Sequence, residues 1–184
     1  MNNVKCEIKK LVIPTYPEPA AEEMPMFAEN RVHQRTSGRP YPNKVVLRVD
    51  RENKIGKEYT VVVLGNEYLK IEILPEIGGR IYSALDKTTG YDFFYKQHVI
   101  KPALIGVLGS WISGGVEFNW PFHHRASGFM PCDFVTETLP DGTAVCHLSE
   151  RDPIDRMKGM VSIVLRPGEK RFETRMRLYN RTDT

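Results

Sequence analysis

The sequence has few cysteines and no block of like charge, and each of these absences excludes some classes of protein. Only three of its 184 residues are cysteines, Cys6, Cys132 and Cys146. Their number is odd and their spacing matches no metal-ligand motif, so we expect free thiols, as in a cytoplasmic protein. The 26 basic and 23 acidic residues are interspersed, and the formal net charge is only +3. Nucleic acid is therefore not an expected partner, because binding it needs clustered basic residues.

Long apolar runs and helical periodicity are also missing. No run approaches the ~20 apolar residues of a membrane-spanning helix, and the first seven residues, MNNVKCE, lack the apolar core of a signal peptide. We therefore expect no membrane association. A length of 184 residues suffices for one sizeable domain but not comfortably for two.

The N-terminal quarter is rich in proline. Residues 1–43 are expected to form an arm that wraps across the surface of the domain or is only partly ordered, because repeated prolines exclude a continuous helix or a central strand. Within this arm, residues 5–14 are expected to form one strand, and residues 20–24 could form a short helical turn.

Residues 44–184 have the sequence pattern of a β-sandwich domain. Period-two alternation and short apolar runs bounded by turn residues predict about ten strands and no helix, which indicates an all-β sandwich. Residues 57–74 read as a hairpin closed at Gly65-Asn66, and the run from Tyr59 to Leu64 reads as a strand buried on both faces. The other strands are expected at residues 44–50, 81–85, 91–95, 132–139, 143–148, 161–165 and 172–178.

The last predicted strand runs almost to residue 184 and no closing element follows it. A finished all-β domain usually covers its sheet edges. We therefore expect the chain to be the N-terminal part of a larger domain, with an open edge through which it could form a homodimer.

The most unusual stretch is residues 109–125. It holds both tryptophans and, within a short span, a carboxylate, an amide, imidazoles and a guanidinium: Trp111, Glu117, Asn119, Trp120, His123, His124 and Arg125. Such a mixture suits the wall of a pocket for a sugar, which has apolar faces and many hydroxyl groups. A second interpretation stays open, since residues 116–120 alternate as a half-buried strand does and both indoles could be core side chains.

Several blocks of the sequence resemble one bacterial family. The blocks are LPEIGGRI (74–81), IKPA (100–103), WISGGVEFNWP (111–121), HHR (123–125) and LYNRT (178–182). The family is an uncharacterised domain that commonly precedes tetratricopeptide repeats and is similar in fold to galactose mutarotase, also called aldose 1-epimerase. The resemblance implies the N-terminal part of a mutarotase-like supersandwich and carbohydrate handling on its concave face. A non-catalytic interaction module of a larger repeat protein is the alternative.

If the chain is an enzyme, we expect aldose-epimerase-like or glycoside-processing chemistry. Mutarotation needs a general base and a general acid, which Glu117 and His124 could supply. Neighbouring residues of a strand point to opposite faces, so only one of His123 and His124 should reach such a site. Glycoside hydrolysis would need two carboxylates at a fixed separation, for which Glu76 and Glu117 are the candidates.

Further candidates for substrate binding are Glu76, Arg80, Lys101 and Arg125, beside Trp111, Asn119, Trp120 and His123. The arginines can bind hydroxyls or a carboxylate bidentately. Each has a structural alternative: Glu76 could accept backbone N–H groups in a turn, and Arg80, Lys101 and Arg125 could form surface salt bridges. No recognised metal-ligand spacing is present, and we expect neither a metal nor a cofactor.

Overall fold

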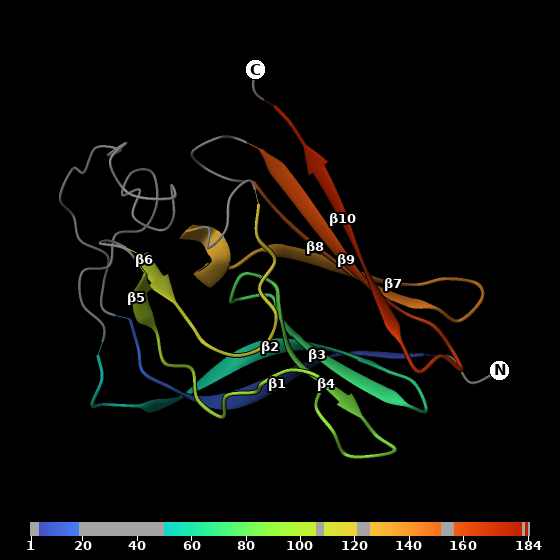
Figure 1. Cartoon of the computed structure of the whole chain (residues 1–184), viewed down its shortest axis with the longest axis horizontal. Coiled ribbons are helices and arrows are strands. Elements are labelled where there is room, and N and C mark those ends of the chain that lie inside the picture. The colour runs from blue at the N-terminus through green and yellow to red at the C-terminus, as the bar shows by residue number, and fades with distance from the viewer. Residues whose placement is uncertain are drawn as a thin grey trace.

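In the computed structural model, the described residues form ten strands arranged as two four-stranded antiparallel sheets and one short hairpin (Figure 1). The structure describes residues 4–18, 50–105, 109–120, 126–151, 157–181 and 183. Within these ranges there is one 3-10 turn, η2 (Ala126–Phe129), and no α-helix. The prediction of an all-β sandwich is confirmed.

The first sheet has the strand order β1-β2-β3-β4. Its strands are β1 (Lys5–Thr15), β2 (Ile55–Gly65), β3 (Leu69–Leu74) and β4 (Arg80–Asp86). β1 and β2 pair over their whole length although residues 16–54 separate them in sequence. The predicted β2–β3 hairpin is confirmed, and Asn66 closes it by accepting the N–H groups of Tyr68 (2.9 Å) and Leu69 (2.7 Å).

The second sheet has the order β10-β9-β8-β7, so β10 and β7 are its edges. Its strands are β7 (Asp133–Thr138), β8 (Ala144–Arg151), β9 (Lys158–Leu165) and β10 (Phe172–Tyr179). Each agrees with a predicted strand to within a few residues. The sheet lies across the first one in Figure 1, where it is drawn in orange and red above the blue and green strands.

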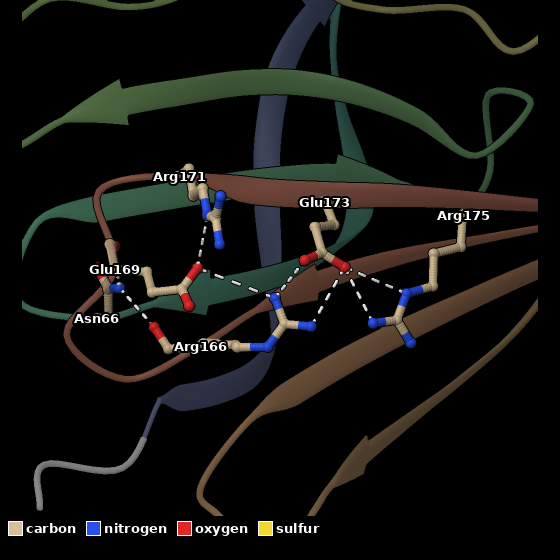
Figure 2. A network of polar contacts seen from close by, with 6 residues as sticks. All are labelled: Asn66, Arg166, Glu169, Arg171, Glu173 and Arg175. Carbon is tan, nitrogen blue, oxygen red and sulfur yellow. Dashed lines mark hydrogen bonds and ion pairs between the residues drawn. The ribbon is translucent and has the colours of Figure 1, made fainter.

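A polar cluster joins the turns of the two sheets at one end (Figure 2). The side-chain amide of Asn66 donates to the carbonyl oxygens of Arg166 and Glu169, each at 2.8 Å. Arg166 also binds the Glu173 carboxylate in a bidentate manner, with N···O distances of 2.5 and 3.2 Å. Arg175 binds the same carboxylate from β10, with its Nη2 at 2.9 Å.

Two layers of apolar side chains stabilise the fold, one on each face of the first sheet. The layer between the sheets includes Val62 and Leu64 from β2 and Cys146, Ile163 and Leu165 from the second sheet. The opposite layer contains the alternate residues of β2 together with side chains such as Ile100 and Ile112 from the loops that cover this face. The run of β2 from Tyr59 to Leu64 is therefore buried on both faces, as its continuous apolar pattern predicts.

One predicted strand, at residues 91–95, is wrong, because this segment makes only one bridge, between Asp92 and Leu85. Residues 116–120, for which a half-buried strand was the open alternative, also make only one bridge, between Val116 and Ile81. Both stretches alternate in sequence, but each lies along the edge of β4 for a few residues and then turns away. The predicted strand at residues 44–50 and the helical turn at residues 20–24 lie almost wholly outside the described residues.

The three cysteines are free thiols, as predicted. Cys146 is buried between the sheets, and burial, with smaller contributions from Cys6 and Cys132, raises the pKa of its thiol to about 12. The described part of the chain contains no helix with the length and hydropathy of a membrane span.

Candidate functional site

The central stretch of residues 109–120 passes from one apolar layer to the other around the edge of β4. It begins in β6 (Gly109–Trp111), which pairs with β5 (Ala103–Ile105). It then meets β4 at Val116, whose N–H donates to the carbonyl of Ile81 at 2.8 Å. Gly115 permits this approach because its φ is 70° and a β-carbon there would lie 2.2 Å from the Ile81 carbonyl oxygen.

The two tryptophans lie in different surroundings. Trp111 is half-buried in the short β5–β6 hairpin, next to the buried Ile112 of the outer layer. Trp120 is only 4% exposed and packs in the layer between the two sheets. Trp120 therefore contributes to the core of the sandwich, which matches the structural interpretation that its sequence pattern left open.

Arg80 anchors the central stretch to the first residue of β4. Its side chain is 2% exposed, and its Nη1 donates to the carbonyl oxygens of Ile112 (3.2 Å) and Gly114 (2.7 Å). Both acceptors belong to the turn that precedes Val116. The guanidinium is thus inside the protein and binds backbone carbonyl groups, whereas a surface salt bridge would lie at the exterior.

Glu76 and Lys101 also contact the protein itself. The Glu76 carboxylate accepts the backbone N–H of Thr60 at 2.8 Å, as expected for a turn residue. The Lys101 ammonium lies 4.5 Å from the centre of the Tyr16 ring, a cation–π contact. Glu76 lies in the turn between β3 and β4, whereas Lys101 lies in the segment just before β5.

Glu117 and Asn119 lie near the end of the central stretch. Glu117 is half-buried, and its carboxylate lies over the 3-10 turn η2: a β-carbon at Gly128 would be 2.7 Å from Glu117 Oε1. Asn119 is exposed to solvent. The remaining candidates, His123, His124 and Arg125, lie outside the described residues.

A small cavity lies next to Trp120 between the two sheets. Its lining includes Gly79, Phe118, Trp120, Leu148 and Val161. The volume is about 10 Å³, which is about enough for one water molecule. This cavity cannot hold a sugar ring. Within the described ranges, no group of three or more His, Cys, Asp or Glu side chains could hold a metal ion.

The structure instead exposes a row of aromatic side chains beside the central stretch. Tyr91, Phe93 and Tyr95 are 65%, 43% and 72% exposed. Tyr91 and Phe93 contact each other edge to face, with ring centroids 6.3 Å apart. We call these three residues the aromatic row. Its alternation is visible in the sequence, but it was interpreted there as an ordinary strand, so the row was missed as a candidate site.

The backbone of the aromatic row is fixed at both ends. Along β4, Asp86 donates its N–H to the carbonyl of Tyr91 (2.8 Å), and Phe93 donates to the carbonyl of Ala84 (2.9 Å). At the other end, Gly115 of the central stretch donates to the carbonyl of Tyr95 at 2.9 Å. The aromatic row and the central stretch are therefore neighbours along the same edge of the first sheet.

Comparison with known proteins identifies the family. A model described as a domain of unknown function, DUF5107, matches residues 40–184, which is most of the chain. The chain belongs to the DUF5107 family. Every strand from β2 to β10 lies within the matched residues, and so do the aromatic row and the central stretch.

The DUF5107 chain is also similar to part of a solved structure, a TPR-domain containing protein from Parabacteroides distasonis ATCC 8503. The two share 22% sequence identity and superpose with a TM-score of 0.81, so the fold is the same. The match covers 96% of this chain but 29% of that protein. The predicted resemblance to an uncharacterised domain that accompanies tetratricopeptide repeats is therefore confirmed at the level of the family and the fold.

Proposed function

We propose that this DUF5107 chain recognises a carbohydrate, with the aromatic row as the surface on which a sugar ring stacks. The observation that carries the proposal is the exposure of Tyr91, Phe93 and Tyr95 on a backbone held by hydrogen bonds. Aromatic rings offer a flat apolar face to the C–H groups of a sugar, and a tyrosine adds a hydroxyl for hydrogen bonding. A fixed backbone lowers the entropic cost of binding.

Polar groups near the row support the same proposal. Asp92 of the aromatic segment bridges β4 at Leu85, and Val116 of the central stretch, three residues before the exposed Asn119, bridges the same strand at Ile81. The points where they meet β4, Leu85 and Ile81, are four residues apart, or ~13 Å along a strand. An oligosaccharide could span that separation.

A more specific form of this proposal is that the domain also catalyses a reaction on the sugar. A galactose mutarotase-like fold would place the general acid and base on a concave face, and Glu117 with His124 is the pair that the sequence offers. Glu117 is half-buried beside η2, and His124 lies outside the described residues. Carbohydrate recognition does not depend on this pair.

Thermal unfolding with a panel of sugars tests the recognition proposal. A ligand present at ten times its Kd adds about 1.4 kcal/mol to the free energy of unfolding, which raises Tm by roughly 3–6 °C for a domain of this size. We expect a selective shift that is lost in the double variant Tyr91→Ala/Phe93→Ala. The matched control is Tyr179→Ala, which removes an exposed aromatic ring from β10 and should keep the shift.

Two results would contradict the proposal. One is a panel of neutral and charged sugars that leaves Tm unchanged. The other is a shift that survives in the double variant, which would place the sugar elsewhere. Trp120→Ala is not a suitable test because Trp120 is a core residue whose loss changes stability by itself.

A second candidate function, a structural or interaction module, is favoured by one observation. β10 is an edge strand, and its apolar residues Met176, Leu178 and Tyr179 are 44%, 50% and 47% exposed. An exposed apolar edge strand can pair with another strand. If two copies pair in this way, sedimentation velocity will show a dimer that Leu178→Lys disrupts, whereas a monomer at high concentration would argue against it.

A further inference from the structure

Charged side chains gather on one face of the first sheet. In the strand register, Lys5 of β1 lies opposite Gly65 of β2, which lies opposite Lys70 of β3. Two residues further along, Glu7 lies opposite Val63, which lies opposite Glu72. Side chains two apart on a strand share a face, so the two rows lie on the same face of the sheet.

The small residues of β2 leave a trough between the charged residues of β1 and β3. Val63 and Gly65 form its floor, and its volume is about 170 Å³. Four lysines line it, Lys5, Lys9, Lys70 and Lys87, together with Glu7. We call these residues the lysine trough. Lys87 overhangs the floor, because a β-carbon at Gly65 would lie 3.8 Å from its ammonium nitrogen.

The carboxylates near the trough are already neutralised. Lys5 and Lys9 both bind the Glu7 carboxylate, and their hydrogen bonds lower the pKa of that group to about 2. Lys70 binds Glu72 at 2.6 Å. Lys96 binds the other oxygen of Glu72 at 3.1 Å. Lys87 donates to the carbonyl oxygen of Asn66 and meets no carboxylate among these contacts.

The result is an excess of positive charge. The four lysines (5, 9, 70 and 87) and the one glutamate (7) that line the trough give +4 − 1 = +3. Lys5 and Lys70 belong to one row and are two strands apart, or ~10 Å. Like charges at such a distance repel each other at low salt, and an anion between them removes the repulsion.

We propose that the lysine trough binds a phosphate monoester or free phosphate. A phosphate group carries nearly two negative charges at neutral pH and three acceptor oxygens, which complements several ammonium donors around a small floor. The trough is smaller than the roughly 300–1,000 Å³ of pockets that enclose a whole ligand, so it suits one charged group. This inference does not depend on carbohydrate recognition by the aromatic row.

Titration of the full chain with inorganic phosphate tests the proposal. The experiment is a two-dimensional 15N NMR titration at low ionic strength and about pH 8, where phosphate is a dianion. We expect saturable shifts of the backbone amides of Gly65, Lys70 and Lys87 with a Kd of about 1 mM. Sodium chloride at matched ionic strength should not produce them. A sugar phosphate in a parallel titration separates the ester from the free ion.

Three variants locate the site. Lys5→Gln/Lys9→Gln should weaken phosphate binding about ten-fold, because it removes two charge-assisted donors. Gly65→Val should abolish binding by filling the floor, and the ordinary 3.8 Å contacts at Gly65 allow the variant to fold, which circular dichroism checks. Lys54→Gln changes an exposed lysine in the loop before β2 and should leave binding within two-fold.

The proposal is overturned if phosphate at about 10 mM, ten times the expected Kd, causes no saturable shift at Gly65. It is also overturned if Lys54→Gln weakens binding as much as the double variant does, since that would show a general charge effect. Saturable binding that Gly65→Val abolishes and Lys54→Gln preserves supports it, whether or not the sugar phosphate binds more tightly.

Discussion

The indole of Trp120 lies so close to Gly159 of β9 that a β-carbon on the glycine would come within 2.0 Å of the ring. The tryptophan thus ends the central stretch inside the sandwich, and the glycine makes space for it. The sequence alone does not reveal this contact, because the two residues are far apart along the chain.

This contact predicts that substitutions at both positions destabilise the protein, one by leaving a cavity and the other by overpacking. Trp120→Ala should destabilise the protein by about 3–5 kcal/mol through lost burial and a cavity. Gly159→Ala should cost about 1–3 kcal/mol through overpacking. Urea unfolding measures both values, and in Trp120→Ala the smaller residue should relieve the clash, so the double variant should be more stable than the sum of the two losses implies. Strict additivity would contradict the contact.

The buried guanidinium of Arg80 predicts a second core effect. Arg80→Met removes the donors to the carbonyls of Ile112 and Gly114, and we expect a loss of about 2–4 kcal/mol. Arg171→Met is the control, because Arg171 forms an exposed ion pair with Glu169 and such pairs contribute about 0–1 kcal/mol. Equal losses in urea unfolding would show that Arg80 does not anchor the central stretch.

Glu173 predicts a pH effect. Hydrogen bonds from Arg166 and Arg175 lower its pKa to about 2 in the folded protein, below the ordinary 4.5. Its contribution to stability is therefore fully present above about pH 4.5 and is lost as the pH falls toward 2. In Arg166→Gln, carbon-13 NMR of the Glu173 carboxyl should show the pKa moving up toward 4.5. An unchanged titration would mean that the pair in Figure 2 does not persist in solution.

Cys146 predicts selective thiol reactivity. A pKa of about 12 leaves about one thiolate in ten thousand at pH 8, and the side chain is buried. The native protein should therefore react with a thiol reagent at Cys146 more slowly than at the half-buried Cys6 and Cys132. Mass spectrometry of the labelled peptides measures the order. In urea all three should react alike, and fast labelling of Cys146 in the native state would contradict its burial.

The strands of the two four-stranded sheets were predictable because their apolar pattern repeats every second residue over five or more positions, whereas the three-residue strands β5 and β6 were not predicted. β2, with its continuous apolar run, and the turn at Asn66 are the clearest cases. The predicted strand at residues 91–95 was wrong, and the strand considered as an alternative at residues 116–120 is also absent, because each segment bridges β4 once and then leaves it. Alternation indicates that an extended segment has one apolar and one polar face. It does not indicate whether a neighbouring strand is available to pair with that segment.

The candidate site was less predictable than the fold. Sequence reasoning correctly singled out the central stretch as unusual, and its glycines have the positive φ values of 92° and 70° at Gly114 and Gly115. It could not show that Arg80 and Trp120 point inward, because polar and aromatic residues in one stretch suit a pocket and a buried anchor equally well. It also missed the lysine trough, whose residues come from strands that only the register brings together.

The burial of β2 on both faces has a consequence for how the protein opens. β2 lies between β1 and β3, so its backbone amides are within the sheet. The side chains of Val62 and Leu64 are buried under the second sheet, and that of Val61 is buried in the layer on the other face. These amides should exchange with deuterium only when the whole domain unfolds, whereas the amides of the edge strand β10 should exchange through local fraying. The slowest-exchanging hydrogens of this protein should therefore mark one strand in the middle of the sandwich, and their rate should report its global stability.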